Sequence, residues 1–71
     1  MLSYKNLWKK LIDENLKRTD LIRLAGISSA TLAKLGDDKA VSMETLVKIC
    51  NALDCEISDI VSVSAKKDMT L

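Results

Sequence analysis

The position of the two glycines constrains this chain more than any other feature of the sequence. The 71 residues include only Gly26 and Gly36 and no proline, and each glycine follows a short segment whose apolar residues recur at spacings of three and four. This spacing is typical of one face of an α-helix, and a glycine just beyond it supplies the left-handed backbone with which many helices end. Strict alternation of apolar and polar residues is hard to find. The pattern therefore predicts an all-α chain.

Five helices are expected from the periodicity, and the first carries a stripe from Tyr4 to Ile12 and ends near Asn15. Gly26 and Gly36 end the second and third helices, and the third covers Ser29 to Leu35. The expected N-caps are Thr19 or a residue just before it, Ser28, Ser42, and Ser58 or a neighbour. The side chains expected in one core are Leu7, Trp8, Leu11, Leu21, Leu24, Leu32, Leu35, Leu46, Ile49 and Leu53. One domain is expected over residues 1–63, followed by a tail, residues 64–71, that lacks a stripe and is expected to fray.

The residue types that are missing argue against an enzyme. The chain has no histidine and only two cysteines, Cys50 and Cys55, so imidazole bases, catalytic triads and tetrahedral zinc sites lack their usual side chains. Both thiols fall on or beside an apolar stripe, which favours small buried hydrophobes over a redox pair. Adjacent carboxylates at 13–14 and 37–38 point in different directions on a helix and have no third ligand nearby. We expect no catalytic residues, no metal, no cofactor and no small-molecule substrate.

Hydropathy and charge limit the partners. No apolar run approaches the roughly 20 residues that span a bilayer, and the first ten residues carry charges where a signal peptide needs an apolar stretch. The expected location is cytoplasmic, with no membrane contact. Residues 1–48 hold nine Lys or Arg against six acids, 9 − 6 = +3, and the rest hold two against four, 2 − 4 = −2. A mild excess of this kind is compatible with a polyanion and does not require one.

The segment from Thr19 to Gly36 carries the functional signal. A short helix, a turn of about three residues that includes Gly26, and a second short helix form a helix-turn-helix pattern. The run TDLIRLAGISSATLAKLG, followed by METLVKICNALD, resembles the DNA-binding domain of phage repressors and Cro-like bacterial regulators over roughly residues 4–62. The resemblance implies a compact five-helix, lambda-repressor-like fold with the helix-turn-helix at helices 2 and 3.

The second helix of the pair is expected to read DNA. A helix enters the major groove only if its outward side chains let the backbone approach the bases, and Ser29, Ala30 and Ala33 leave that room. Lys34 adds one long donor. By resemblance, the base-reading positions map onto Ser29, Ala30 and Lys34, with Ser28 and Thr31 at the groove edge; Ala33 joins the base-reading set because alanine can touch a thymine methyl.

Phosphate contacts are expected around this helix. Lys17 and Arg18 lie near the start of the first helix of the pair. The resemblance adds Lys39, Ser42 and Thr45, in the loop and helix start that follow the recognition helix. Two positions depart from the family: alanine replaces a polar reader at Ala30, and a long amide is usual at Arg18. The acids at 37–38 would repel phosphates unless they turn away.

Two functions remain open from the sequence. The first is a sequence-specific regulator of transcription, a bacterial or prophage repressor that binds double-stranded DNA, and a homodimer because one short helix reads few base pairs. Its dimer surface is sought first among Val61, Val63, Met69 and Leu71. The alternative is a protein-interaction module, such as an antitoxin or adaptor, that keeps the fold. DNA is favoured if Arg18, Lys34, Lys39, Lys9 and Lys10 converge on the side of the recognition helix, and the adaptor is favoured if they scatter and Asp37 and Asp38 dominate.

Overall fold

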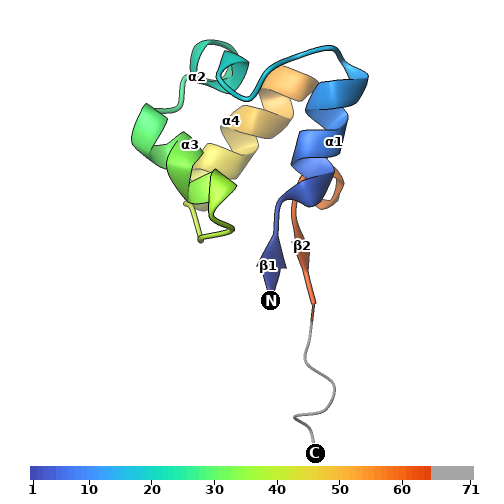
Figure 1. Ribbon diagram of the computed structural model, residues 1–71, viewed down its shortest axis with the longest axis vertical. Coiled ribbons are helices and arrows are strands. Elements are labelled where there is room, and N and C mark those ends of the chain that lie inside the picture. Colours follow the sequence, from blue (N-terminus) through green and yellow to red (C-terminus); the bar gives the residue numbers. More distant parts are fainter. Residues whose placement is uncertain (65–71) are drawn as a thin grey trace, which may run out of the picture.

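The computed structural model describes residues 1–64, which form four α-helices, one 3₁₀ turn and two very short strands (Figure 1). The elements in chain order are β1 (Leu2–Ser3), α1 (Lys5–Asp13), α2 (Asp20–Ala25), α3 (Ser29–Gly36), α4 (Met43–Leu53), η1 (Ile57–Asp59) and β2 (Ser62–Val63). In Figure 1, α4 lies between α1 and the α2–α3 pair, and β1 and β2 extend side by side away from the helices. Helices therefore dominate the fold, as the periodicity predicts.

Serine side chains begin two of the helices as expected. Ser28 Oγ accepts the Thr31 N–H at 3.1 Å at the start of α3, and Ser42 Oγ accepts the Thr45 N–H at 3.1 Å at the start of α4. Both N-cap predictions are confirmed. Thr19 occupies the N-cap position of α2 but has helical backbone angles and makes no capping hydrogen bond. The Asp20 carboxylate bonds the preceding turn instead, accepting the Lys17 N–H at 2.8 Å.

Left-handed residues end the helices, but only one of them is a glycine. Gly26 has φ 69° and ends α2 as predicted, whereas Asn15, Asp38 and Asp54 have φ 62°, 56° and 54° after α1, α3 and α4. The prediction for Gly36 was wrong, because Gly36 is the last helical residue of α3. The Lys39 N–H bonds Lys34 O at 2.9 Å, and this closing bond of a Schellman motif puts Asp38 in the left-handed position.

The C-terminal segment departs from the expected fifth helix. After one turn at η1, whose N-cap is Glu56 rather than Ser58, Leu2 pairs with Val63 and Ser3 with Ser62 in an antiparallel ladder. The fold is mostly helical as expected, but the predicted fifth helix is replaced by one 3₁₀ turn and this two-residue ladder. Residues 57–63 contain four β-branched Ile and Val residues, which favour extended backbone once a partner strand is present. The partner comes from the other end of the chain, so local periodicity does not indicate it.

The core lies between the four helices and the segments that carry Tyr4 and Ile60, near the two ends of the described chain. Seven of the ten predicted residues are buried, namely Leu7, Leu11, Leu21, Leu35, Leu46, Ile49 and Leu53. Trp8 and Leu32 are half-buried against that core. The prediction for Leu24 was wrong, because this side chain is 39% exposed. Leu21 and Ala25, four residues apart, form the buried face of α2, and Leu24 lies at the edge of that face. Ile12, 74% exposed, similarly lies beyond the face set by Leu7 and Leu11.

The ends of the described chain meet. Ser64 N–H bonds Met1 O at 2.8 Å, so the residue where the tail was expected to begin still pairs with the N-terminus. Met69 and Leu71, named for a dimer surface, lie outside the described residues. Within residues 1–64 no helix has the length and apolar character to cross a bilayer.

Candidate nucleic-acid interface

The turn between α2 and α3 is built from three residues with separate roles. Gly26 takes the left-handed conformation, and Ile27 beside it is 7% exposed and joins the core. Ser28 then caps α3. Because Ile27 anchors the turn from within, the start of α3 is fixed relative to α2, as a helix-turn-helix requires.

One face of α3 is free and its side chains are short. Leu35 is buried and Leu32 half-buried, while Ser29, Ala30 and Ala33 are exposed together with Lys34. Figure 1 places α3 at the side of the helical body away from α1. No acid lies within Ser29–Gly36, so Lys34 is the only charged side chain of this helix. The surface is thus narrow, uncharged over its first turn and positive near its end.

The serine and threonine hydroxyls at the starts of α3 and α4 form hydrogen bonds within their own helix turn. Ser28 Oγ accepts the Thr31 N–H and donates to Thr31 Oγ1 at 3.0 Å. Ser42 and Thr45 repeat this arrangement, with their hydroxyl oxygens 3.0 Å apart. A threonine hydroxyl that accepts one hydrogen bond keeps its own proton to donate. Thr31 therefore remains able to donate to an acceptor at the edge of α3.

The loop from Asp37 to Val41 is attached to the start of α1. Asp38 Oδ1 accepts the Tyr4 N–H at 3.2 Å, and the Tyr4 hydroxyl donates to Lys39 O at 2.8 Å. Burial raises the pKa of Tyr4 above its ordinary value, so the phenol stays protonated and keeps donating. Asp37 and Asp38 are both exposed, but only the Asp38 carboxylate accepts a hydrogen bond, from the Tyr4 N–H, among the described residues.

Lys17 and Arg18 occupy the turn before α2, and both are exposed. The pKa of the Asp20 carboxyl is lowered, mainly because the carboxylate accepts a hydrogen bond from the Lys17 N–H. The Arg23 guanidinium, 3.4 Å from Asp20 Oδ1, lowers this pKa further. Arg18 has a different neighbour: its guanidinium carbon lies 3.9 Å from the centre of the Trp8 ring. The expected phosphate-binding arginine is therefore stacked on an aromatic residue of α1.

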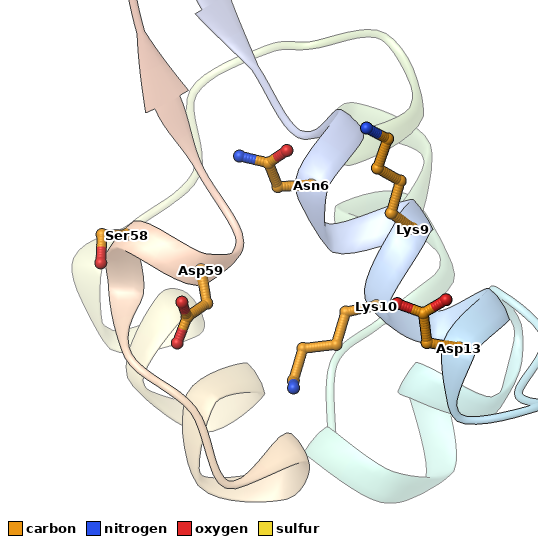
Figure 2. A pocket seen from close by; sticks show the side chains of 6 residues that line it. All are labelled: Asn6, Lys9, Lys10, Asp13, Ser58 and Asp59. Atoms are coloured by element: carbon orange, nitrogen blue, oxygen red, sulfur yellow. The ribbon is translucent and has the colours of Figure 1, made fainter.

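The basic residues do not all gather on one side. Lys9 and Lys10 line an open cleft between α1 and η1, together with Asn6, Asp13, Ser58 and Asp59 (Figure 2). Lys10 also lies 3.5 Å from Glu14. Arg18, Lys34 and Lys39 belong to the other elements, around α3. The two lysines of α1 therefore lie in the cleft and not on the recognition helix, so the five basic residues do not form one surface.

The cysteines and acids offer no obvious metal centre. Cys50 is buried, and Cys55 is partly exposed next to it. Burial raises the pKa of Cys55 to about 11, and Cys50 adds to that shift. Among residues 1–64 no group of three or more Cys, Asp and Glu side chains is placed to hold a metal ion.

Sequence reasoning missed the contacts that join distant segments. The Trp8 ring below Arg18 and the Tyr4 bonds to residues 38 and 39 were not expected, although Tyr4 and Trp8 were assigned to the core stripe of the first helix. The spacing of apolar residues indicates which face of a helix is buried, but it does not indicate which residues from other segments contact the edge of that face. An arginine near an aromatic residue in sequence is too common to signal such a pair.

Comparison with known proteins agrees with this geometry. Residues 6–66 match the model of the Cro/C1-type HTH DNA-binding domain. The crystal structure of transcriptional regulator VanUg, form II, is similar with a TM-score of 0.86 and 40% sequence identity, over 92% of this chain and 87% of that chain. No curated protein matches the sequence.

The family match covers all but the first residue of α1 and the whole of α2, α3 and α4, including the α2–turn–α3 unit whose sequence carried the resemblance. The similar structure extends over nearly all of the chain, so the likeness is not confined to a short motif. The chain therefore belongs to the Cro/C1-type HTH DNA-binding domain family.

Proposed function

We propose that this protein is a transcriptional regulator that binds double-stranded DNA sequence-specifically, with α3 in the major groove. The observation that carries the proposal is the exposed face of α3, where two alanines and a serine precede one lysine. The major groove, about 12 Å wide, admits an α-helix, and short facing side chains allow the helix backbone to approach the base edges closely. The similarity to a transcriptional regulator supports the regulatory role.

The side chains of this face suit particular base edges. Lys34 can donate to the O6 and N7 acceptors of guanine, and Ala30 and Ala33 can pack against thymine methyls. Ser29 can donate or accept. Ser28 and Thr31 take the groove edge, where the free Thr31 proton can reach a phosphate or base acceptor. We infer a short recognition sequence containing guanine and thymine.

Residues around α3 are proposed to hold the DNA backbone. Arg18 and Lys17 precede α2, and Lys39 follows α3 in the loop attached to Tyr4. Ser42 and Thr45 stand at the start of α4, which carries Glu44 in its first turn. Such contacts position a domain without reading sequence. One carboxylate oxygen of Asp38 is directed at the Tyr4 N–H, at the start of α1.

A homodimer and a repressor role complete the proposal. One helix reads few base pairs, so two half-sites about 34 Å apart multiply the specificity. Repression in a bacterium or prophage is the role that the phage-repressor resemblance favours. The alternative, an adaptor that uses the same fold to bind protein, predicts no preference among duplexes.

Selection from random duplexes, followed by titration at several salt concentrations, tests the proposal. We expect enrichment of a two-fold symmetric sequence and an affinity that falls as salt rises. Equal affinity for selected and unselected duplexes at every salt concentration contradicts sequence-specific reading. The absence of any duplex binding favours the adaptor.

A further inference from the structure

We propose that Trp8 is a positioning residue for DNA binding, because its indole holds the Arg18 guanidinium where it can contact a backbone phosphate beside α3. The inference rests on the proposed function, which assigns a phosphate to Arg18. It assigns a role in the interface to α1, a helix that carries none of the residues expected to touch DNA.

The contact joins a fixed ring to an exposed cation. The Arg18 guanidinium carbon is 3.9 Å from the Trp8 ring centre, well inside the roughly 6 Å range of a cation–π interaction. Trp8 packs against the core from α1, whereas Arg18 is exposed in the turn before α2. The position of the ring is therefore set by folding, and the ring restricts where the arginine head can lie.

The contact with the ring leaves donors of the arginine free. The guanidinium carries five N–H donors in its plane, and only those directed at the Trp8 ring are used by this contact. Within residues 1–64 no carboxylate lies within ion-pair distance of Arg18, in contrast to Arg23, which pairs with Asp20 at 3.4 Å. The remaining donors of Arg18 are thus available to an external anion, and a phosphate matches their forked geometry.

The arginine head also lies beside the end of the recognition helix. A Cβ built on Gly36, the last residue of α3, would be 3.8 Å from Arg18 Nη1. The carboxyl end of a helix attracts a positive charge, so this position favours the cation. The Trp8 ring, the Arg18 head and the end of α3 therefore meet at one place, next to the face proposed to enter the groove.

A held arginine binds a phosphate with less loss of side-chain freedom. Arginine has many rotamers, and ordering them on binding weakens the association. With the ring in place, part of that ordering has occurred before DNA arrives. From the range of cation–π strengths, we expect loss of the ring to weaken DNA binding about 2- to 30-fold through Arg18.

The first arm of the test uses the free protein. In its NMR spectrum, the side-chain protons of Arg18 are expected upfield of ordinary arginine values, because they lie over the indole. Trp8→Leu is expected to return them to ordinary values. Trp8 is the single tryptophan of the chain, so Arg18→Gln should also change the intrinsic fluorescence. Ordinary shifts in the wild type would overturn the inference without reference to DNA.

The second arm is a double-mutant cycle in DNA binding with Trp8→Leu, Arg18→Gln and the double variant, each checked for folding by circular dichroism. We expect Trp8→Leu to weaken binding and to lower the salt slope toward that of Arg18→Gln. In the Arg18→Gln background the same change should have no further effect. Trp8→Phe, which keeps an aromatic face, should restore part of the affinity. Lys9→Gln, which removes a positive charge in the α1–η1 cleft, is the matched control and should retain the affinity.

The outcomes separate this inference from the proposed function. Equal effects of Trp8→Leu with and without Arg18 would mean that the ring acts only through the fold, and the inference would fail while DNA binding stands. Unchanged binding by Trp8→Leu would overturn it as well. If the wild type binds no duplex, the proposed function fails and the assignment of a phosphate to Arg18 fails with it, whatever the NMR arm reports.

Discussion

The exposed face of α3 and the cleft between α1 and η1 both present lysine, but in different surroundings. On α3, Lys34 is the only charged residue and its neighbours are serine and alanine. In the cleft, of about 400 Å³, Lys9 and Lys10 share the walls with Asp13 and Asp59 (Figure 2). The first surface has an uncompensated charge and room for a backbone to approach, and the second has balanced charges.

The comparison teaches that counting basic residues does not locate a nucleic-acid surface. Of the nine Lys and Arg residues in 1–48, one lies on α3 and two lie in the cleft, where two acids balance them. What distinguishes α3 is the combination of short side chains and the absence of acids in the helix, which leaves room for close approach and adds no repulsion from phosphates.

The largest effect is expected from Ala30→Glu, which places a carboxylate and a longer side chain on the α3 face. Like charges brought together at an interface oppose association by several kcal/mol, so DNA binding should fall by more than about 100-fold. Lys9→Glu reverses a charge in the cleft and is the control. Titration of a selected duplex with each variant gives the result. Comparable losses for both would mean that the two surfaces do not differ as described.

A second prediction concerns how α3 is attached to the core. Leu35 is 0% exposed, so Leu35→Ala should lower the free energy of unfolding by about 2–5 kcal/mol, a large part of the stability of so small a domain. Leu32 is half-buried, and Leu32→Ala should lower it by less. Urea unfolding measures both. A greater loss at Leu32 would show that α3 is rotated about its axis from the position described.

Lys34→Ala separates the recognition of a base pair from non-specific attraction to the DNA backbone. Loss of its donor should remove about 1–3 kcal/mol of discrimination at one base pair, while weak binding to unrelated duplexes persists. Competition among duplexes that differ at single positions locates that base pair. A uniform loss across all duplexes would instead identify Lys34 as a phosphate contact.

The smallest effect is expected at Asp20, the first residue of α2, which is neither on α3 nor among the cleft residues. Its pKa is lowered in the folded protein, chiefly by the Lys17 N–H bond. A lowered folded-state pKa stabilises the fold above the ordinary value of 3.8, and this contribution disappears as the pH falls through the folded value. Asp20→Asn should therefore be slightly less stable than wild type at neutral pH and equal to it in acid. A difference that grows in acid would contradict this direction.

The parts of the fold that depend on neighbours in sequence could be predicted. Ser28 and Ser42 bond amides three residues ahead, and Gly26 acts through its own backbone freedom. The same local logic failed at Gly36, because the left-handed position falls two residues later, at Asp38. Asn and Asp also tolerate this conformation, so composition did not distinguish the candidates.

The parts that depend on long-range contacts could not be predicted. The β1–β2 ladder joins the two ends of the described chain, and Tyr4 reaches residues 38 and 39. Leu24 and Ile12 lie at the margins of their helical faces, where a few tens of degrees of rotation decide exposure. For the site, the exposed face of α3 followed from its pattern, while the Trp8 ring beneath Arg18 depended on how α1 packs.

The most direct test of the central claim is an NMR titration of the isotope-labelled protein with a selected duplex. If α3 lies in the major groove, the largest amide shift changes will fall on residues 28–34, with further changes at 17–18 and 39–45, and the cleft residues of α1 and η1 will change little. The largest changes at Asn6, Lys9, Asp13 and Asp59, with α3 unaffected, would contradict the claim.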